Sequence, residues 1–164
     1  MQRKTLSDSL CPIALSLEQV GEWWSLLIMR DALQGVSRFD EFSKSLNIAP
    51  NMLTRRLNAL VEAGLLERRA YCVKPLRHEY IPTGKGRDLQ VVLYALIAWG
   101  NQHFVSDEIA VQVVDRTSGR PLRPMMVDEV DGRVVPWDEC DLAPGPGASQ
   151  GIVERLQFMK DALK

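Results

Sequence analysis

The chain has little of what secreted, membrane or disulfide-rich proteins need. Its 164 residues include only three cysteines, Cys11, Cys72 and Cys140, whose wide spacing argues against a disulfide framework and against a zinc site. The apolar run Val91–Trp99 is far too short to span a bilayer, and residues 1–10 lack the layout of a signal peptide. We therefore expect a cytoplasmic protein with reduced thiols and no membrane association.

Motifs for catalysis and for nucleotide binding are missing as well. The two histidines, His78 and His103, lie far apart and have no partner at metal-ligand spacing. The Gly84-Lys85-Gly86 segment does not satisfy the phosphate-loop pattern, and no nucleophile elbow is present. The sequence therefore predicts a protein that is not an enzyme and that holds no metal and no cofactor.

Charge of either sign is not in excess over the whole chain, but it is unevenly distributed. The net charge is −1, whereas residues 50–87 carry 8 basic and 3 acidic side chains. The rest of the chain is acidic on balance. A basic block in an acidic chain is typical of a surface that contacts nucleic-acid phosphates, although a solvated charged face would look the same.

Hydrophobic periodicity predicts a series of short helices followed by a hairpin. Apolar residues at helical spacing predict helices over 13–20, 22–34, 38–45 and 51–63. The last two are joined by a turn of about four residues, which gives a helix-turn-helix. Strands are expected at 65–71 and 78–81, with a loop at 72–77. A hairpin that directly follows a helix-turn-helix is a wing. A single long helix over 85–104 follows, with Ser37 and Thr83 as caps of the third and the long helix.

Residues 105–164 differ in character from the segment before them. Ile109, Val111 and Val113 alternate as a half-buried strand would, and Asp131-Gly132 is typical of a two-residue hairpin turn. A final helix is expected over 151–163. We predict a mainly helical α+β chain with two domains, a winged helix-turn-helix and dimerisation domain at 1–104 and a small β/α extension at 105–164.

The helix over 51–63 carries the residues expected to read DNA. Its apolar positions must face the core, which leaves a polar face opposite. Asn and Arg side chains can read adenine and guanine edges bidentately, and they cluster in the half of the helix that enters the major groove. The residues predicted to contact bases are Asn51, Thr54, Arg55 and Asn58.

A second group of residues is expected to hold the DNA backbone or to act from the wing, which we place at 72–78. Each of them could instead be an ordinary solvated surface residue. This group comprises Arg38, Arg56, Lys74, Arg77 and His78.

The order of these motifs resembles the HxlR-type winged-helix regulators, a branch related to the MarR family. The resemblance rests on several short segments between residues 11 and 104. They are Cys11-Pro12-Ile13-Ala14, Gly21-Glu22-Trp23-Trp24, Arg38-Phe39-Asp40-Glu41-Phe42, Pro50-Asn51-Met52-Leu53-Thr54-Arg55-Arg56-Leu57, Glu62-Ala63-Gly64-Leu65-Leu66 and Tyr80-Ile81-Pro82-Thr83-Gly84. The resemblance implies a homodimer on a pseudo-palindromic DNA operator, with helices 12–20 and 85–104 as the dimer contacts.

The resemblance also draws attention to Cys11, because several relatives carry there a thiol that senses oxidants or electrophiles. A thiolate at a helix start is favoured by the dipole, and Arg3 or Lys4 would help. The alternative is a small buried residue that fills a gap at the dimer interface. The resemblance also implies paired cysteines in the extension of some longer relatives, a pattern typical of a metal site. Here Ser118, Asp128 and Asp131 stand at such positions and Cys140 is alone, so we expect no structural metal.

Two functions of different class are compatible with the sequence. The first is a sequence-specific DNA-binding dimer, acting as a repressor by default, with an effector that the sequence does not identify. The second is a winged-helix module that uses the same helix to hold a protein partner. The basic block favours DNA.

Overall fold

The computed structural model describes residues 11–105 and 108–162. The chain divides into two compact units. One unit is Gln19–Pro124, and the other contains the described residues up to Glu18 together with those from Met125 onward. The predicted boundary at residues 104 and 105 therefore falls inside the first unit, which also takes in the first part of the extension.

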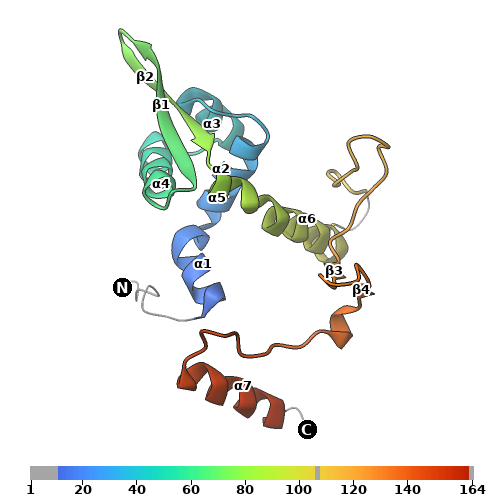
Figure 1. Cartoon of the computed structure of the whole chain (residues 1–164). Helices are drawn as coiled ribbons and strands as arrows, with labels where there is room; N and C mark the ends of the chain where they lie inside the picture. The colour runs from blue at the N-terminus through green and yellow to red at the C-terminus, as the bar shows by residue number, and fades with distance from the viewer. Residues whose placement is uncertain (1–10, 106–107, 163–164) are drawn as a thin grey trace. The chain divides into compact units, whose positions relative to one another are not determined.

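Three helices and a two-stranded hairpin form the core of the first unit. In Figure 1, α2 (Trp23–Leu33), α3 (Phe39–Leu46) and α4 (Pro50–Glu62) gather together, and the hairpin of β1 (Leu66–Val73) and β2 (Leu76–Pro82) projects from them. The largest fully buried side chains come from all three helices and from β1. They are Phe42, Ile28, Met29, Leu53, Leu57, Leu60 and Leu66. This arrangement is a winged helix-turn-helix, which confirms the predicted fold class.

Helices α2 and α3 are joined by a buried carboxylate. Asp31 is 4% exposed, and its Oδ2 accepts a hydrogen bond of 2.7 Å from the hydroxyl of Ser45. Arg30 neutralises the same carboxylate with an Nη2–Oδ1 distance of 2.7 Å. Because a buried carboxylate is tolerated only when it is paired and hydrogen-bonded, these contacts hold α3 in a fixed position against α2.

The start of α3 differs from the expectation that Ser37 caps it. The residue before the helix is Arg38, in extended conformation, and the acceptor is the carboxylate of Glu41. Its Oε2 accepts the backbone N–H groups of Arg38 at 2.9 Å and of Ser37 at 3.0 Å. The Glu41 carboxylate therefore satisfies two N–H groups at the start of α3, as the glutamate of a capping box does.

The wing is longer and more regular than predicted. The strands β1 and β2 pair antiparallel from Leu66 opposite Pro82 to Val73 opposite Leu76, so the turn is Lys74-Pro75 rather than a loop over 72–77. The register shifts between Ala70 and Cys72, which leaves Tyr71 as the extra residue of a β-bulge. A bulge re-aims a side chain, and Tyr71 belongs to the site described below.

The single long helix predicted over 85–104 is two helices. The short helix α5 (Gly84–Asp88) is followed by Leu89 and then by α6 (Gln90–Phe104). Thr83 caps α5 as predicted, since its hydroxyl oxygen accepts the N–H of Gly86 at 3.0 Å. Lys85 donates from Nζ to the carbonyl of Ala63 at 2.8 Å, beside the C-terminal end of α4, where a positive charge is favourable.

The extension contains fewer regular elements than predicted. Ile109 and Val111 are 58% and 59% exposed and form no strand, and the neighbouring backbone pairing is an isolated bridge between Val114 and Pro121. The described part of the second unit holds a two-residue pair, β3 (Met126–Val127) with β4 (Val134–Val135), around a six-residue loop rather than a two-residue turn. A 3-10 turn, η1 (Trp137–Glu139), and the helix α7 (Gln150–Ala162) follow.

The remaining helix of the structure is α1 (Pro12–Val20), close to the predicted range. Among residues 11–105 and 108–162, no helix combines the length and the apolar composition that crossing a bilayer requires.

Gly86 provides a test of the packing between α5 and the end of α4. A Cβ at this position would lie 2.1 Å from the carbonyl oxygen of Leu65, whereas a Cβ at Gly84 would meet nothing within 4 Å. We expect Gly86→Ala to lower the free energy of unfolding by about 1–3 kcal/mol, because backbone must move to admit the methyl group. Urea denaturation of Gly86→Ala beside Gly84→Ala measures this. Equal stability of the two variants would contradict the packing described here.

Candidate DNA-binding interface

Helix α4 presents an apolar face and a polar face, as its sequence predicts. Leu53, Leu57 and Leu60 have no exposed surface and pack in the core. The four residues predicted to read bases are all exposed and lie in the first nine positions of the helix. They are Asn51, Thr54, Arg55 and Asn58. The structure therefore brings these residues together on one surface.

The hydrogen bonds of this face are local to the helix. The Thr54 hydroxyl donates to the carbonyl of Pro50 at 2.9 Å, and Oδ1 of Asn51 accepts the N–H of Met52 at 2.7 Å. Arg55 Nη2 lies 3.8 Å from the sulfur of Met52, a weak contact. None of these contacts connects the polar face to another element, so the face stays open to a ligand. The positive end of the helix at Pro50 adds to the attraction for phosphate.

Arg56 is not part of this surface. Its side chain is 13% exposed, and its Nη2 lies 2.9 Å from Oε2 of Glu22, the residue that precedes α2. The guanidinium is therefore directed to the protein and not to solvent. This placement does not support the prediction that Arg56 holds the DNA backbone. The pattern of α4 alone gives no sign of the carboxylate before α2 that binds Arg56.

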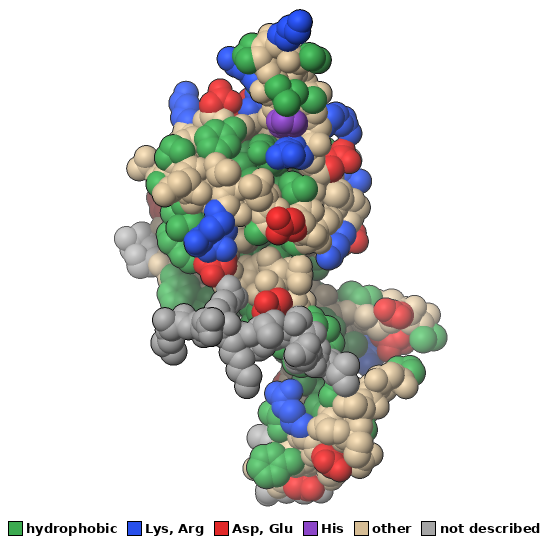
Figure 2. All heavy atoms as spheres, turned by 90° about the vertical axis from the view of Figure 1, so that its left-hand side faces the viewer, with side chains coloured by type: hydrophobic (Ala, Val, Ile, Leu, Met, Phe, Trp, Pro, Cys, Tyr) green, Lys and Arg blue, Asp and Glu red, His purple; other side chains and the backbone are tan. Residues whose placement is uncertain are grey.

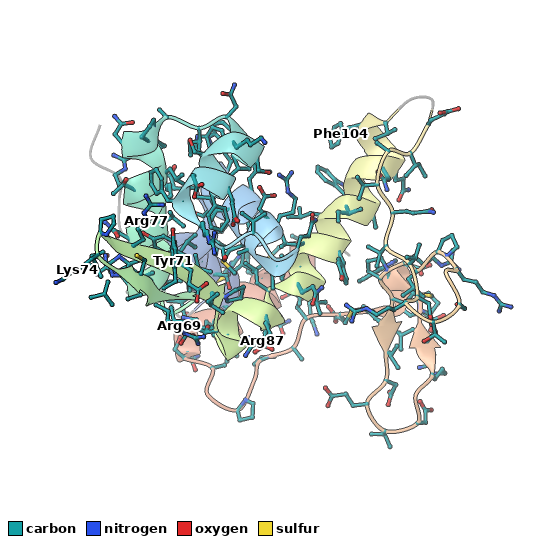
Figure 3. All side chains as sticks on the ribbon, turned by 90° about the horizontal axis from the view of Figure 1, so that it is seen from above. Arg69, Tyr71, Lys74, Arg77, Arg87 and Phe104 are labelled. Atoms are coloured by element: carbon teal, nitrogen blue, oxygen red, sulfur yellow. The ribbon has the colours of Figure 1, made fainter. Side chains whose placement is uncertain are left out.

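The wing carries the other predicted cations. Lys74 forms the turn with Pro75, Arg77 is exposed opposite Cys72, and His78 is half-buried opposite Ala70. Figure 2 shows Lys and Arg side chains at the tip and on the flanks of the projecting wing. In Figure 3, Lys74, Tyr71 and Arg77 lie along the wing, whereas Arg87 lies on α5. The wing thus extends the positive surface beyond α4, while Arg87 donates to the carbonyl of Pro82 at 2.7 Å.

Arg38 connects the start of α3 to the wing. Its guanidinium carbon lies 4.6 Å from the ring centroid of Tyr71, a cation–π contact, and its backbone forms a bridge with Glu79 of β2. The N–H of Tyr80 donates to the carbonyl of Ser37 at 2.8 Å. Arg38 is exposed, as a phosphate ligand would be, but its partner Tyr71 was not identified from the sequence, because a bulge leaves no clear local signal.

A shallow hollow of about 400 Å³ lies between the wing and α3. Side chains of both elements line it; aromatic rings predominate, and Arg77 and Asp40 carry opposite charges. The lining residues are Phe39, Asp40, Tyr71, Arg77, His78 and Tyr80. The hollow sits beside the Arg38–Tyr71 contact, so a backbone phosphate in this position would meet positive charge from two elements.

Cys11 lies directly before α1, and its thiol is partly exposed. The backbone N–H groups of Ala14, and next of Ile13, lower the pKa of this thiol, and the side chain of Arg155 on α7 lowers it further. A helix start and a cation are the two features that favour a thiolate. The predicted helpers Arg3 and Lys4 lie outside the described residues, and Arg155 was missed because it is 144 positions further along the chain.

Within residues 11–105 and 108–162, the structure shows neither a metal-binding cluster nor a disulfide. In the described part of the chain, no group of three or more His, Cys, Asp or Glu side chains is placed to hold a metal ion. Cys72 is half-buried in the wing and Cys140 is exposed, and among the described residues neither of them forms a disulfide with Cys11 or with the other.

The described geometry is that of a DNA-binding winged-helix regulator, and comparisons with known proteins agree. Residues 19–108 match the HxlR-like helix-turn-helix family. An uncharacterized HTH-type transcriptional regulator of Mycobacterium tuberculosis, Rv3095, is 36% identical over 136 residues, which is 82% of this chain and 86% of the relative. The chain belongs to the HxlR-like helix-turn-helix family, which confirms the resemblance, and its relatives are transcriptional regulators rather than enzymes.

Solved structures extend the likeness beyond the family segment. PA1374 of Pseudomonas aeruginosa, described as a candidate transcription factor, is 63% identical, with a TM-score of 0.68 over 88% of this chain and 99% of that one. PA1607, described in the same way, is 37% identical, with a TM-score of 0.76 over 85% of this chain and 99% of that one. Because each match covers 85% or more of this chain, it includes part of the extension past residue 108.

The thiol of Cys11 gives a prediction that needs no DNA. In a Cys72→Ser/Cys140→Ser background, we expect the rate of iodoacetamide alkylation to reach half its maximum at a lower pH in folded than in urea-unfolded protein, because the pKa is lowered. Arg155→Gln should move this midpoint toward the unfolded one. Lys160→Gln removes another cation of α7, which pairs with Asp141 at 3.0 Å, and should leave it unchanged. Equal midpoints for folded and unfolded wild type would contradict the contacts described.

Proposed function

We propose that the protein is a homodimeric, sequence-specific regulator that reads a pseudo-palindromic operator. Helix α4 reads the major groove, and the wing contacts the flanking backbone or minor groove. The observation that carries this proposal is the exposed face of Asn51, Thr54, Arg55 and Asn58 on a helix whose opposite face is fully buried. Membership of a family of helix-turn-helix transcriptional regulators supports DNA binding.

The side chains of the face suit base edges. Asn51 and Asn58 can pair bidentately with adenine and Arg55 with guanine, while the Thr54 methyl group can contact thymine. Each such bidentate pair is worth about 1–3 kcal/mol of discrimination against a wrong base. We assign Arg38, Lys74, Arg77 and His78 to phosphate and minor-groove contacts, which position the protein without reading sequence.

Exposed apolar side chains on two helices support the homodimer. Ile13 on α1 is 69% exposed. On α6, Trp99 and Phe104 are 55% and 72% exposed, with ring centroids 4.9 Å apart, and the only buried residue of the helix is Leu93. Large apolar surfaces of this kind mark protein interfaces. A second copy of the chain on α1 and α6 would cover them, and two recognition helices related by a two-fold axis would read a palindrome.

The remaining features of the proposal concern regulation. We propose that the dimer represses transcription by occupying a promoter, and that it works in the cytoplasm. We propose that Cys11 senses oxidants or electrophiles, because the N–H groups of α1 and Arg155 favour its reactive thiolate. The alternative function, a winged-helix module for a protein partner, does not use the cations of α4 and the wing.

The role of Arg55 can be tested against a matched arginine. Arg55→Ala should weaken binding to a selected operator by about 1–3 kcal/mol and relax preference at one base position, because a bidentate contact is lost. Arg87→Ala removes the same charge on α5, away from the proposed surface, and should change operator affinity little. Fluorescence anisotropy with operator and single-base variants measures both effects.

The same titrations, repeated at several salt concentrations, separate DNA from a protein partner. Binding to phosphates weakens linearly in log salt with a slope of about −0.9 per phosphate neutralised. Operator binding that ignores salt, or an Arg87→Ala defect as large as that of Arg55→Ala, would contradict the proposed interface.

A further inference from the structure

The ion pair between Arg56 and Glu22 joins the recognition helix to the junction of α1 and α2. Glu22 comes two residues after the end of α1 at Val20 and directly before α2. Its carboxylate does not cap α2 but lies 2.9 Å from the Nη2 of Arg56. The two side chains are 13% and 35% exposed, so the pair is largely removed from solvent on the arginine side.

Stability alone gives a poor account of this pair. The Nε of Arg56 is buried and has no hydrogen-bond partner among the described residues. An incompletely satisfied, largely buried charge costs free energy, and replacing such pairs by apolar side chains is often neutral or stabilising. In some proteins, buried polar or ionic groups instead select one arrangement of elements over others.

The position of Arg56 on α4 indicates which arrangement is selected. Arg56 follows Arg55 by about 100° around the helix and lies between the polar face and the buried leucines. The leucines, being apolar, resist a rotation of the helix only through packing, whereas the ion pair has a direction. A bidentate contact to a base tolerates errors of only about 10–20° in the orientation of the side chain that makes it.

We infer that Arg56 is a positioning residue whose ion pair with Glu22 refines the rotation of α4 that the buried leucines set, and so keeps the reading side chains within the narrow angular range that base contacts need. This inference rests on the proposed function and replaces the assignment of Arg56 to the DNA backbone. Arg56 contacts no DNA in this role. Its partner Glu22 transmits the position of the α1–α2 junction to the reading face.

Substitutions of Glu22 separate positioning from phosphate binding. Glu22→Gln keeps the shape of the side chain and removes its charge. We expect the ratio of operator affinity to affinity for unrelated DNA to fall about tenfold, the size of one bidentate contact, with an unchanged salt slope. If Arg56 were a phosphate ligand, Glu22→Gln would leave the affinity equal or raise it, and Arg56→Gln would reduce the salt slope by about one.

A double variant distinguishes positioning from a merely structural role. Glu22→Met/Arg56→Met replaces the pair by apolar side chains, and we expect urea unfolding at wild-type denaturant concentration or above, together with the same tenfold loss of the affinity ratio. Should the double variant not fold, Arg56→Lys keeps the charge without the planar fork and should show part of the loss. Glu67→Gln, in the exposed pair with Arg69, is the control and should behave as wild type.

The outcomes are distinct from those that test the proposed function. Wild-type protein without preference for any DNA would overturn the proposed function, and this inference with it. Wild-type specificity in Glu22→Gln and in the double or lysine variant would overturn the inference alone, and so would a reduced salt slope in Arg56→Gln with normal affinity in Glu22→Gln.

Discussion

The complete burial of one face of α4 is the constraint on which the interface depends. Leu53, Leu57 and Leu60 have no exposed surface and pack with α2, α3 and β1. Each fully buried leucine contributes about 1.5–3 kcal/mol by its removal from water. Because helical residues three and four positions apart share a face, this burial turns Asn51, Thr54, Arg55 and Asn58 outward. The reading surface is thus a consequence of core packing.

Other contacts hold α3, α5 and the wing in place around α4. The Asp31–Ser45 hydrogen bond fixes α3 against α2, and Lys85 and Gly86 hold α5 at the end of α4. Arg38 reaches Tyr71 across the junction of α3 and the wing, so the wing is tied to the helices by more than its own strands. The recognition helix and the wing therefore belong to one packed unit. Two surfaces that contact the same duplex need such a fixed arrangement.

The sequence predicted the elements that local periodicity determines. The helices α2, α3 and α4 and both strands of the wing appear within a few residues of their expected positions, since apolar spacing and turn residues mark them. The predictions of the wing-strand ends, of one uninterrupted helix through Leu89 and of a strand at Ile109–Val113 were wrong. The strand errors arise because strand pairing is tertiary and local periodicity does not show it.

In the candidate site too, local periodicity predicted some features and missed those that depend on distant residues. The exposure of the four α4 residues could be predicted from the period of one helix. The partner of Arg56, the bulge at Tyr71 and the arginine near Cys11 could not, because Glu22, Arg38 and Arg155 come from other elements. Polar contacts between distant residues leave no periodic pattern in a sequence. A count of the cations in residues 50–87 therefore overestimates the surface that contacts DNA, because it includes residues such as Arg56 that bind other parts of the protein.

Selection of bound fragments from a random pool of duplex DNA tests the central claim most directly. The account predicts an enriched inverted repeat whose half-sites lie about one helical turn apart, roughly 10 base pairs from centre to centre or a multiple of this. Guanine and adenine positions in each half-site should match the arginine and asparagines of α4. A pool that shows no enrichment, or a single half-site without symmetry, would contradict a dimer that reads DNA through this helix.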